Sequence, residues 1–226
     1  MKVASFSDSH GQIYLPVVED DTDIICIAGD VIPLNVQSSD EYSYVWFVDE
    51  FLRWAKELNP NVKKIFLVAG NHDKYFEHIG ADAIKEIIAK EGLSDKVIYL
   101  EDETYIYEGY KITGSPWVKN LPRWSFNSDN LTESFNFIED CDILITHMPP
   151  MVDKVGCSYP YQAYERNFGS IELTKVFEDK NIKVNVCGHV HTGIHNGVPY
   201  GNTMIYNVSM INESYYESYP VTYFEI

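Results

Sequence analysis

The stretch "LVAGNHDKY" (residues 67–75) places an amide, an imidazole and a carboxylate directly after an apolar run that ends in glycine. Short aliphatic runs without internal proline are typical of strands that are buried on both faces. Asn71, His72 and Asp73 therefore stand where a buried strand ends. They are either a polar turn or a group of ligands at the edge of a sheet.

Four other apolar runs end in the same way. Together the five strands are expected at 2–7, 23–28, 63–69, 142–146 and 184–187. The metal-competent residues that follow them are Asp8, His10, Asp30, Asn71, His72, Asp73, His147, His189 and His191. In open α/β sheets, ligands bind beyond the carboxyl ends of the strands, so we expect these side chains to meet at one edge. Five of the seven histidines stand at these positions, which favours ligands over a polar turn.

A glycine precedes a candidate ligand in three of these blocks, at Gly29, Gly70 and Gly188. A residue without Cβ lets a strand bend sharply and lets the backbone approach an ion or a phosphate. Taken singly, each of these positions is also compatible with an ordinary turn glycine.

The remaining pattern indicates an α/β fold. Helices are expected at 41–58, 82–90 and 170–180, and further strands at 203–208 and 221–226. The segment 97–115 alternates between apolar and polar residues around the turn "EGYK", which predicts antiparallel strands. We expect one domain, residues 1–226, built as a four-layer-type sandwich of two mixed β-sheets flanked by helices. The strand order stays open.

Charge and cysteine usage limit the function classes. There are 17 Lys+Arg against 34 Asp+Glu, a formal net charge of −17, which disfavours binding to long nucleic acid. The N-terminus carries no basic and apolar leader, and no apolar stretch is long enough for a membrane span. We therefore expect a cytoplasmic protein without a membrane partner. Cys26, Cys141 and Cys187 lie in apolar runs and are expected to be reduced core residues.

The five polar blocks in order, "DSH", "GD", "GNHD", "TH" and "GHVH", resemble the calcineurin-like metallophosphoesterases. That family carries Asp-x-His, Gly-Asp, Gly-Asn-His-Asp/Glu, a lone His and Gly-His-x-His. The chain looks most like the small metallophosphoesterase-domain-containing protein subfamily, because it contains "ITGSPW" (112–117), "DILITHMPP" (142–150) and "YNVS" (206–209).

The resemblance implies two divalent metal ions at the carboxyl ends of the strands. One ion would be held by Asp8, His10 and His191, and the other by Asn71, His147 and His189, with Asp30 bridging both. His72 would face the substrate beside Asn71 and would not be a ligand. A mixed set of nitrogen and oxygen ligands suits Mn²⁺, Fe or Zn²⁺ better than Ca²⁺, but it does not distinguish among these three.

The implied reaction is hydrolysis at phosphorus. A hydroxide that bridges the two ions would attack, and His72 would act as general acid for the leaving group. Asp73 would either orient His72 or cap the helix that follows. No oligomeric state is implied.

The substrate class is narrowed by a departure from the family pattern. Protein phosphatases of this fold carry Asp-Arg after Gly-Asp, and "GDVIPLN" has neither residue. The subfamily likeness favours a small phosphodiester, such as a nucleotide ester. The alternatives are a phosphomonoesterase of the same fold and a non-catalytic metal-binding scaffold.

Aromatic residues near the expected site offer candidate contacts with a base. The connection 157–168 would be either a lid or a surface loop, and its Tyr159, Tyr161 and Tyr164 would stack a base or pack on the domain. The same two roles are open for Trp117. His78 and His195 are expected on the surface or in loops.

Overall fold

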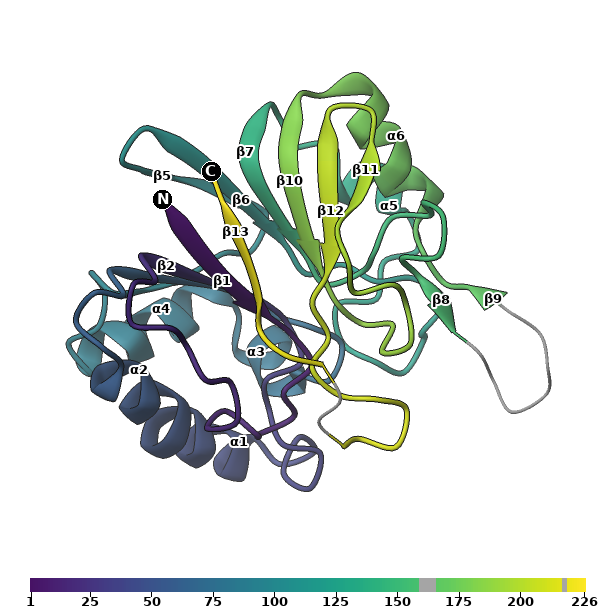
Figure 1. Ribbon diagram of the computed structural model, residues 1–226. Coiled ribbons are helices and arrows are strands. Elements are labelled where there is room, and N and C mark those ends of the chain that lie inside the picture. The colour runs from purple at the N-terminus through teal and green to yellow at the C-terminus, as the bar shows by residue number, and fades with distance from the viewer. Residues whose placement is uncertain (159–165, 217–218) are drawn as a thin grey trace.

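Two β-sheets pack face to face in the computed structural model, which describes residues 1–158, 166–216 and 219–226 (Figure 1). From edge to edge, the first sheet consists of β13 (Thr222–Glu225), β1 (Lys2–Phe6), β2 (Ile24–Ala28), β3 (Lys64–Val68) and β4 (Val97–Tyr99). The second consists of β11 (Val198–Tyr200), β12 (Thr203–Asn207), β10 (Ile182–Cys187), β7 (Cys141–Thr146), β6 (Tyr110–Ser115) and β5 (Glu103–Tyr107). A separate small ribbon pairs β8 (Cys157–Ser158) with β9 (Arg166–Asn167).

Helices cover the outer face of each sheet (Figure 1). Those on the first sheet are α1 (Asp40–Trp46), the π-helical segment η1 (Phe47–Leu52), α2 (Arg53–Glu57), α3 (Lys74–Ile79) and α4 (Ala81–Lys90). Those on the second are α5 (Leu131–Ser134) and α6 (Ile171–Asp179). The helix expected over 41–58 is present, but a π-helical segment interrupts its middle.

Three apolar clusters fill the spaces between these four layers. Strand β2 shows why, because its successive side chains point to opposite faces of the sheet. Ile25 and Ile27 belong to the cluster shared with the helices, whereas Cys26 and Ala28 belong to the cluster between the two sheets. A third cluster lies between the second sheet and α6, around Leu173. The predicted four-layer sandwich of two mixed sheets is confirmed.

The segment 97–115 differs in part from its prediction. β5 and β6 form the expected antiparallel hairpin, in which Tyr107 pairs with Tyr110 across the turn. β4, however, pairs in parallel with β3 as an edge strand of the first sheet. The alternating pattern was therefore right for the hairpin and wrong for β4.

Both sheets are mixed, and their parallel strands bring the two sets of carboxyl ends together. β1, β2 and β3 run parallel in the first sheet, as do β7 and β10 in the second. The ends of β1 and β12 are joined across the two sheets by backbone hydrogen bonds from Ser7 N to Val208 O (2.9 Å) and from Met210 N to Ser7 O (3.0 Å). The five segments that carry the predicted ligands therefore begin at the same edge of the sandwich, where these strands end.

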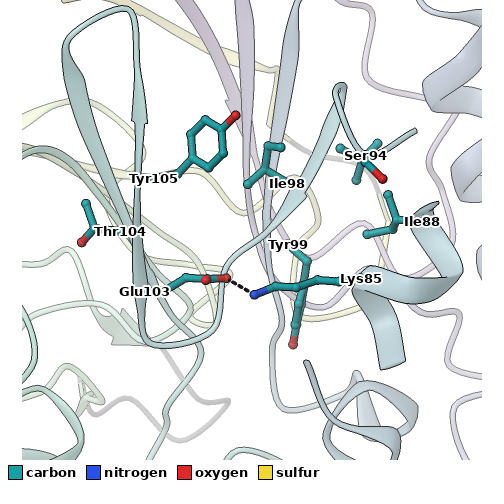
Figure 2. A pocket seen from close by; sticks show the side chains of 9 residues that line it. Lys85, Ile88, Ser94, Ile98, Tyr99, Glu103, Thr104 and Tyr105 are labelled. Atoms are coloured by element: carbon teal, nitrogen blue, oxygen red, sulfur yellow. Dashed lines mark ion pairs between the residues drawn. The ribbon is translucent and has the colours of Figure 1, made fainter. Parts of the chain in front are cut away.

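A hollow of about 280 Å³ lies elsewhere, between α4 and the strands β4 and β5. Figure 2 shows the side chain of Lys85 reaching from α4 to Glu103, with which it forms an ion pair of 2.6 Å. None of the predicted ligands lines this hollow.

Cys26, Cys141 and Cys187 are buried thiols, as predicted. Among the described residues, no helix combines the length and the apolar character needed to cross a membrane.

Candidate metal centre

The polar residues at the strand ends converge on one buried cluster. Ligand-capable atoms lie within 4.8 Å of one another in three overlapping groups, which are Asp8–His10–His191, Asp8–Asp30–His147 and His10–Asp30–His72. Asp8 and His147 are fully buried, and Asp30 is 2% exposed. Because isolated carboxylates are rarely buried without a cationic partner, this cluster has the composition of a metal site.

The carboxylate of Asp8 is held on one side by the protein. Its Oδ2 accepts hydrogen bonds from Ser209 Oγ (2.7 Å), from the amide of His189 (3.0 Å) and from Ser7 Oγ. Its Oδ1 lies 3.5 Å from Nε2 of His191. The His189 amide also lies 3.3 Å from Oδ1, but the shorter contacts gather on Oδ2, which leaves Oδ1 better placed to coordinate an ion.

His147 shows the hydrogen-bond pattern of a metal-ligating histidine. Its Nδ1 donates to the carbonyl of Ala28 (2.7 Å), and its Nε2 lies 3.0 Å from Oδ1 of Asn71 and 3.3 Å from Oδ2 of Asp30. A ligating imidazole usually donates its second ring N–H to a carbonyl or a carboxylate, which sets the tautomer. Burial opposes its protonation, but the Asp30 carboxylate outweighs burial and raises the pKa of His147 to about 9.

His10 and His191 supply an independent test of whether a metal fits. In the described part of the chain, both ring nitrogens of His10 and Nδ1 of His191 are buried without a hydrogen-bond partner. Buried polar atoms are normally satisfied, so these orphaned nitrogens are suited to coordination. Burial also lowers the pKa of His10 to about 4, which keeps it in the neutral form that binds a cation. The donor set therefore fits a bound metal.

Four of the ten described non-glycine residues with a positive φ belong to this cluster. Asp8 (φ 55°), His10 (φ 42°), Asp30 (φ 55°) and His189 (φ 69°) all adopt the left-handed region. Residues other than glycine occupy this region at an energetic cost, and such strain gathers at functional sites. Each of these four residues is a predicted ligand.

The glycines before the ligands have a spatial explanation. A Cβ on Gly29 would lie 2.5 Å from Nδ1 of His147, and one on Gly70 would lie 2.7 Å from Cε1 of the same ring. The imidazole delivered by the second sheet thus occupies the space that a side chain on the first sheet would need. Close approach, rather than turn geometry alone, requires glycine at Gly70.

Both roles predicted for Asp73 are wrong. Its carboxylate accepts four backbone N–H groups, from Asp30 (2.8 Å), Val31 (3.0 Å), Ile32 (2.9 Å) and Gly70 (2.8 Å). Within the described residues it caps no helix, although it stands at the start of α3. Asp73 therefore ties the loop after β2 to the loop after β3, and so holds two ligand loops in register.

His72 lies at the edge of the cluster. Its Nδ1 is 2.8 Å from Oε1 of Gln37, and its ring centroid is 4.2 Å from that of Trp124. Its ring also lies edge-on to His10, with centroids 4.7 Å apart. Burial lowers the pKa of His72. The imidazole of His72 therefore lies beside the predicted ligands, and Gln37 and Trp124 contact its ring.

The structure brings the other predicted residues to the same place. The His189 ring centroid lies 5.0 Å from that of His147, and Asn71 reaches the cluster through its contact with the same ring. The assignment of each residue to a particular ion stays a prediction. Sequence reasoning missed Gln37, Trp124 and Ser209, although Ser209 ends the quoted block "YNVS".

The aromatic candidates have different outcomes. Trp117 donates its indole N–H to Asp102 (2.6 Å) and packs edge-on against Phe126, so it has a structural role. Tyr159, Tyr161 and Tyr164 lie outside the described residues, as does most of the predicted lid. Tyr215 was not predicted, yet its ring centroid lies 5.2 Å from that of His10 and 5.6 Å from that of His191.

Comparison with known proteins agrees with this geometry. The sequence profile described as "Calcineurin-like phosphoesterase" matches residues 1–193. The chain belongs to this family. Members of the calcineurin-like phosphoesterases typically bind two divalent ions, and the described side chains provide candidate ligand groups for them.

Individual relatives extend the match over most of the chain. "Metallophosphoesterase domain-containing protein 1" of Homo sapiens and that of Mus musculus are each 29% identical over 239 residues, which cover 92% of this chain and 66% of the relative. The chain thus spans just under two thirds of the length of these curated relatives.

Two solved structures have the same fold. One crystal structure superimposes with a TM-score of 0.67 at 19% identity, covering 91% of this chain and 89% of that one. The phosphopantetheinyl hydrolase of Mycobacterium tuberculosis has a TM-score of 0.52 at 17% identity, covering 92% and 88%. At these identities, the likeness shows the fold alone.

Proposed function

We propose that this chain is a metal-dependent phosphohydrolase that acts on a small phosphodiester, such as a nucleotide ester. The observation that carries the proposal is the buried group of Asp8, Asp30 and His147, whose ligand atoms lie within 4.8 Å of one another. Next to this group, His10 has two ring nitrogens without a partner among the described residues. Such a set is difficult to explain as packing, because it buries two carboxylates with unsatisfied imidazoles.

We assign the residues to two ions. Asp8, His10 and His191 would hold one ion, and Asn71, His147 and His189 the other. Asp30 is suited to the bridge because its Oδ2 lies 3.3 Å from Nε2 of His147 and 3.9 Å from Nε2 of His10. When bound, Mn²⁺, Fe or Zn²⁺ would supply a water that ionises near neutral pH and positive charge that stabilises the reacting phosphoryl group.

His72 is proposed as the general acid. Cleavage of a phosphoester releases an alkoxide, which requires a proton. Since Nδ1 of His72 is engaged by Gln37, Nε2 is the nitrogen available to donate. The side chain is only partly buried, unlike those of Asp8 and Asp30, which is consistent with contact to an incoming substrate. Asn71, adjacent in the chain, would contact the same substrate.

The segment after Asp30 favours a diester. Val31 and Ile32 are buried in the core next to the helices. Protein phosphatases of this fold carry Asp-Arg after Gly-Asp, whereas the segment "GDVIPLN" has no arginine to hold a phosphate. A diester carries one negative charge and a monoester up to two, so less positive charge is needed for a diester. We therefore place diester hydrolysis first.

A monoesterase is the second candidate, and one observation favours it. Nζ of Lys74 lies 4.7 Å from the ring of Trp124, which itself contacts His72, so a cation stands near the proposed acid. A third candidate, a scaffold without catalysis, is disfavoured by the presence of every predicted ligand at the site.

The test is hydrolysis of bis-p-nitrophenyl phosphate and p-nitrophenyl phosphate by chelator-stripped protein, with and without added Mn²⁺. Metal-dependent turnover that prefers the diester supports the proposal, and preference for the monoester supports the second candidate. If the protein binds two ions and hydrolyses neither ester with any of the three metals, it is a scaffold.

The role of His72 is tested separately by His72→Ala. This variant should keep its metals and should lose about 10²–10⁴-fold in rate on an ester with a poor leaving group, which is the usual contribution of a positioned acid. Loss of a metal ion from the variant would make His72 a ligand instead, as its membership of the group with His10 and Asp30 would permit.

A further inference from the structure

Gln37 contacts the proposed acid from the same loop that carries the predicted ligand Asp30. This loop lies between β2 and α1, and the Gln37 amide Oε1 lies 2.8 Å from Nδ1 of His72. The amide Nε2 of the same side chain donates to the carbonyl of Leu34 (3.2 Å), which defines which end of the amide is oxygen. Because an amide oxygen only accepts, Nδ1 of His72 must carry the hydrogen.

The face of the His72 ring is held as well. Trp124 packs on it with ring centroids 4.2 Å apart and planes inclined by 44°. Trp124 is itself fixed, because the next residue donates its amide to the carbonyl of Asn71 (3.3 Å) and Phe126 donates its amide to Glu77 (2.7 Å). A hydrogen bond at Nδ1 and a tilted aromatic ring in contact leave the imidazole little freedom to rotate.

We infer that Gln37 is a positioning residue for His72. Its oxygen accepts the hydrogen of Nδ1 and thereby turns Nε2 toward the leaving group of the substrate. In the acid form the ring carries a hydrogen on both nitrogens, and the Nε2 proton passes to the leaving oxygen as its bond to phosphorus breaks, which returns the ring to the neutral form with hydrogen on Nδ1. This inference rests on the proposed function, in which His72 protonates that leaving group. Gln37 adds no charge to the site, so it acts through the orientation and the tautomer of the ring rather than through electrostatic attraction.

The variant Gln37→Leu removes the acceptor with little change in volume. The matched control is Gln12→Leu, since Gln12 is likewise partly buried and its side chain, among the described residues, donates to the backbone carbonyl of Tyr215 (3.4 Å). Gln37→Glu, which keeps an acceptor oxygen, is the conservative rescue. All are assayed with bis-p-nitrophenyl phosphate, whose leaving group departs without a proton, and with dibenzyl phosphate, whose alkoxide requires one.

We expect Gln37→Leu to lower kcat for dibenzyl phosphate by about 10–100-fold, a fraction of what a positioned acid contributes. For bis-p-nitrophenyl phosphate, kcat should change by less than about twofold on the same argument. KM and the number of bound metal ions should stay as in the unsubstituted protein. Gln37→Glu should recover most of the lost rate, and Gln12→Leu should behave as the unsubstituted protein does.

A spectroscopic readout tests the inference without catalysis. In the Zn²⁺-loaded protein, ¹⁵N NMR of the His72 ring should show the tautomer with hydrogen on Nδ1, and Gln37→Leu should shift it toward the other tautomer. Absence of the Nδ1–H tautomer from the unsubstituted protein overturns the inference, whatever the activity. Equal slowing on both esters together with loss of metal overturns it too, because Gln37 would then support a ligand. If neither ester is hydrolysed although the Nδ1–H tautomer is present, the proposed function fails and the contact stands.

Discussion

Replacing Asp73 should destabilise the fold and the metal site together. Its carboxylate is fully buried and accepts N–H groups from Asp30, Val31, Ile32 and Gly70 at 2.8–3.0 Å. A buried donor that loses its acceptor costs about 1–3 kcal/mol. Four donors at the low end of that range give about 4 kcal/mol for Asp73→Ala, and water entering the space would keep the value near this lower limit.

Asp73→Asn separates hydrogen bonding from volume. The amide keeps one acceptor oxygen, but its NH₂ group would face two backbone donors. We expect a loss of about 2–4 kcal/mol, because two backbone N–H groups lose their acceptor and face a donor instead. Both variants should bind metal more weakly, because Asp73 holds the amide of Asp30 in a strained conformation.

The assay is urea unfolding of the metal-free proteins, with metal content measured alongside. The control is Asp142→Ala, because Asp142 accepts one backbone N–H, from Lys111 at 2.8 Å, and pairs with Lys183 near the surface. The control should lose about 1 kcal/mol, the value of a single hydrogen bond. A loss below about 1 kcal/mol for Asp73→Ala, with both ions retained, would refute the reasoning.

Three further perturbations follow from the same geometry. Ser209→Ala removes a 2.7 Å donor from Oδ2 of Asp8 and should weaken metal binding by about 10-fold or more, measured by competition with a chelator. Gly70→Ala should destabilise the fold by about 2 kcal/mol or more in urea unfolding, because its Cβ would meet the ring of His147 at 2.7 Å. In the metal-free protein the pKa of His147 rises from 6.5 to about 9, so its contribution to stability is complete below pH 6.5 and is lost as the pH rises through about 9. Metal requires the neutral ring, so affinity should increase across that same window by up to about tenfold per pH unit, measured by calorimetry at several pH values.

The parts of the site that are local in the sequence were predictable. Each candidate ligand follows a buried strand directly, and parallel strands of one layer end at one edge, so their convergence could be expected from the sequence alone. The four layers were predictable for the same reason, since runs such as that of β2 are apolar on both faces. The π-helical segment inside 41–58 has no comparable local signal.

The supports of the ligands are non-local, and the sequence does not reveal them. Asp73 accepts N–H groups from Asp30, Val31 and Ile32, which precede it by 43, 42 and 41 positions. Ser209 donates to Asp8, which lies 201 positions earlier. The Asp73 pairings depend on which strands are neighbours in the first sheet, and the Ser209 pairing depends on how the two sheets meet. No local pattern encodes either. For Asp73 this produced a wrong prediction, because a carboxylate before a helix is most simply read as a cap.

The central claim is that two ions share Asp30. The measurement that tests it most directly is anomalous scattering from crystals of the protein loaded with Mn²⁺. Two peaks are predicted about 3.5–4 Å apart, the spacing of two-metal phosphoesterase sites, with Asp30 between them. One peak would lie beside Asp8 and His191, and the other beside Asn71 and His147. A single peak, or two peaks that do not share Asp30, would contradict the claim.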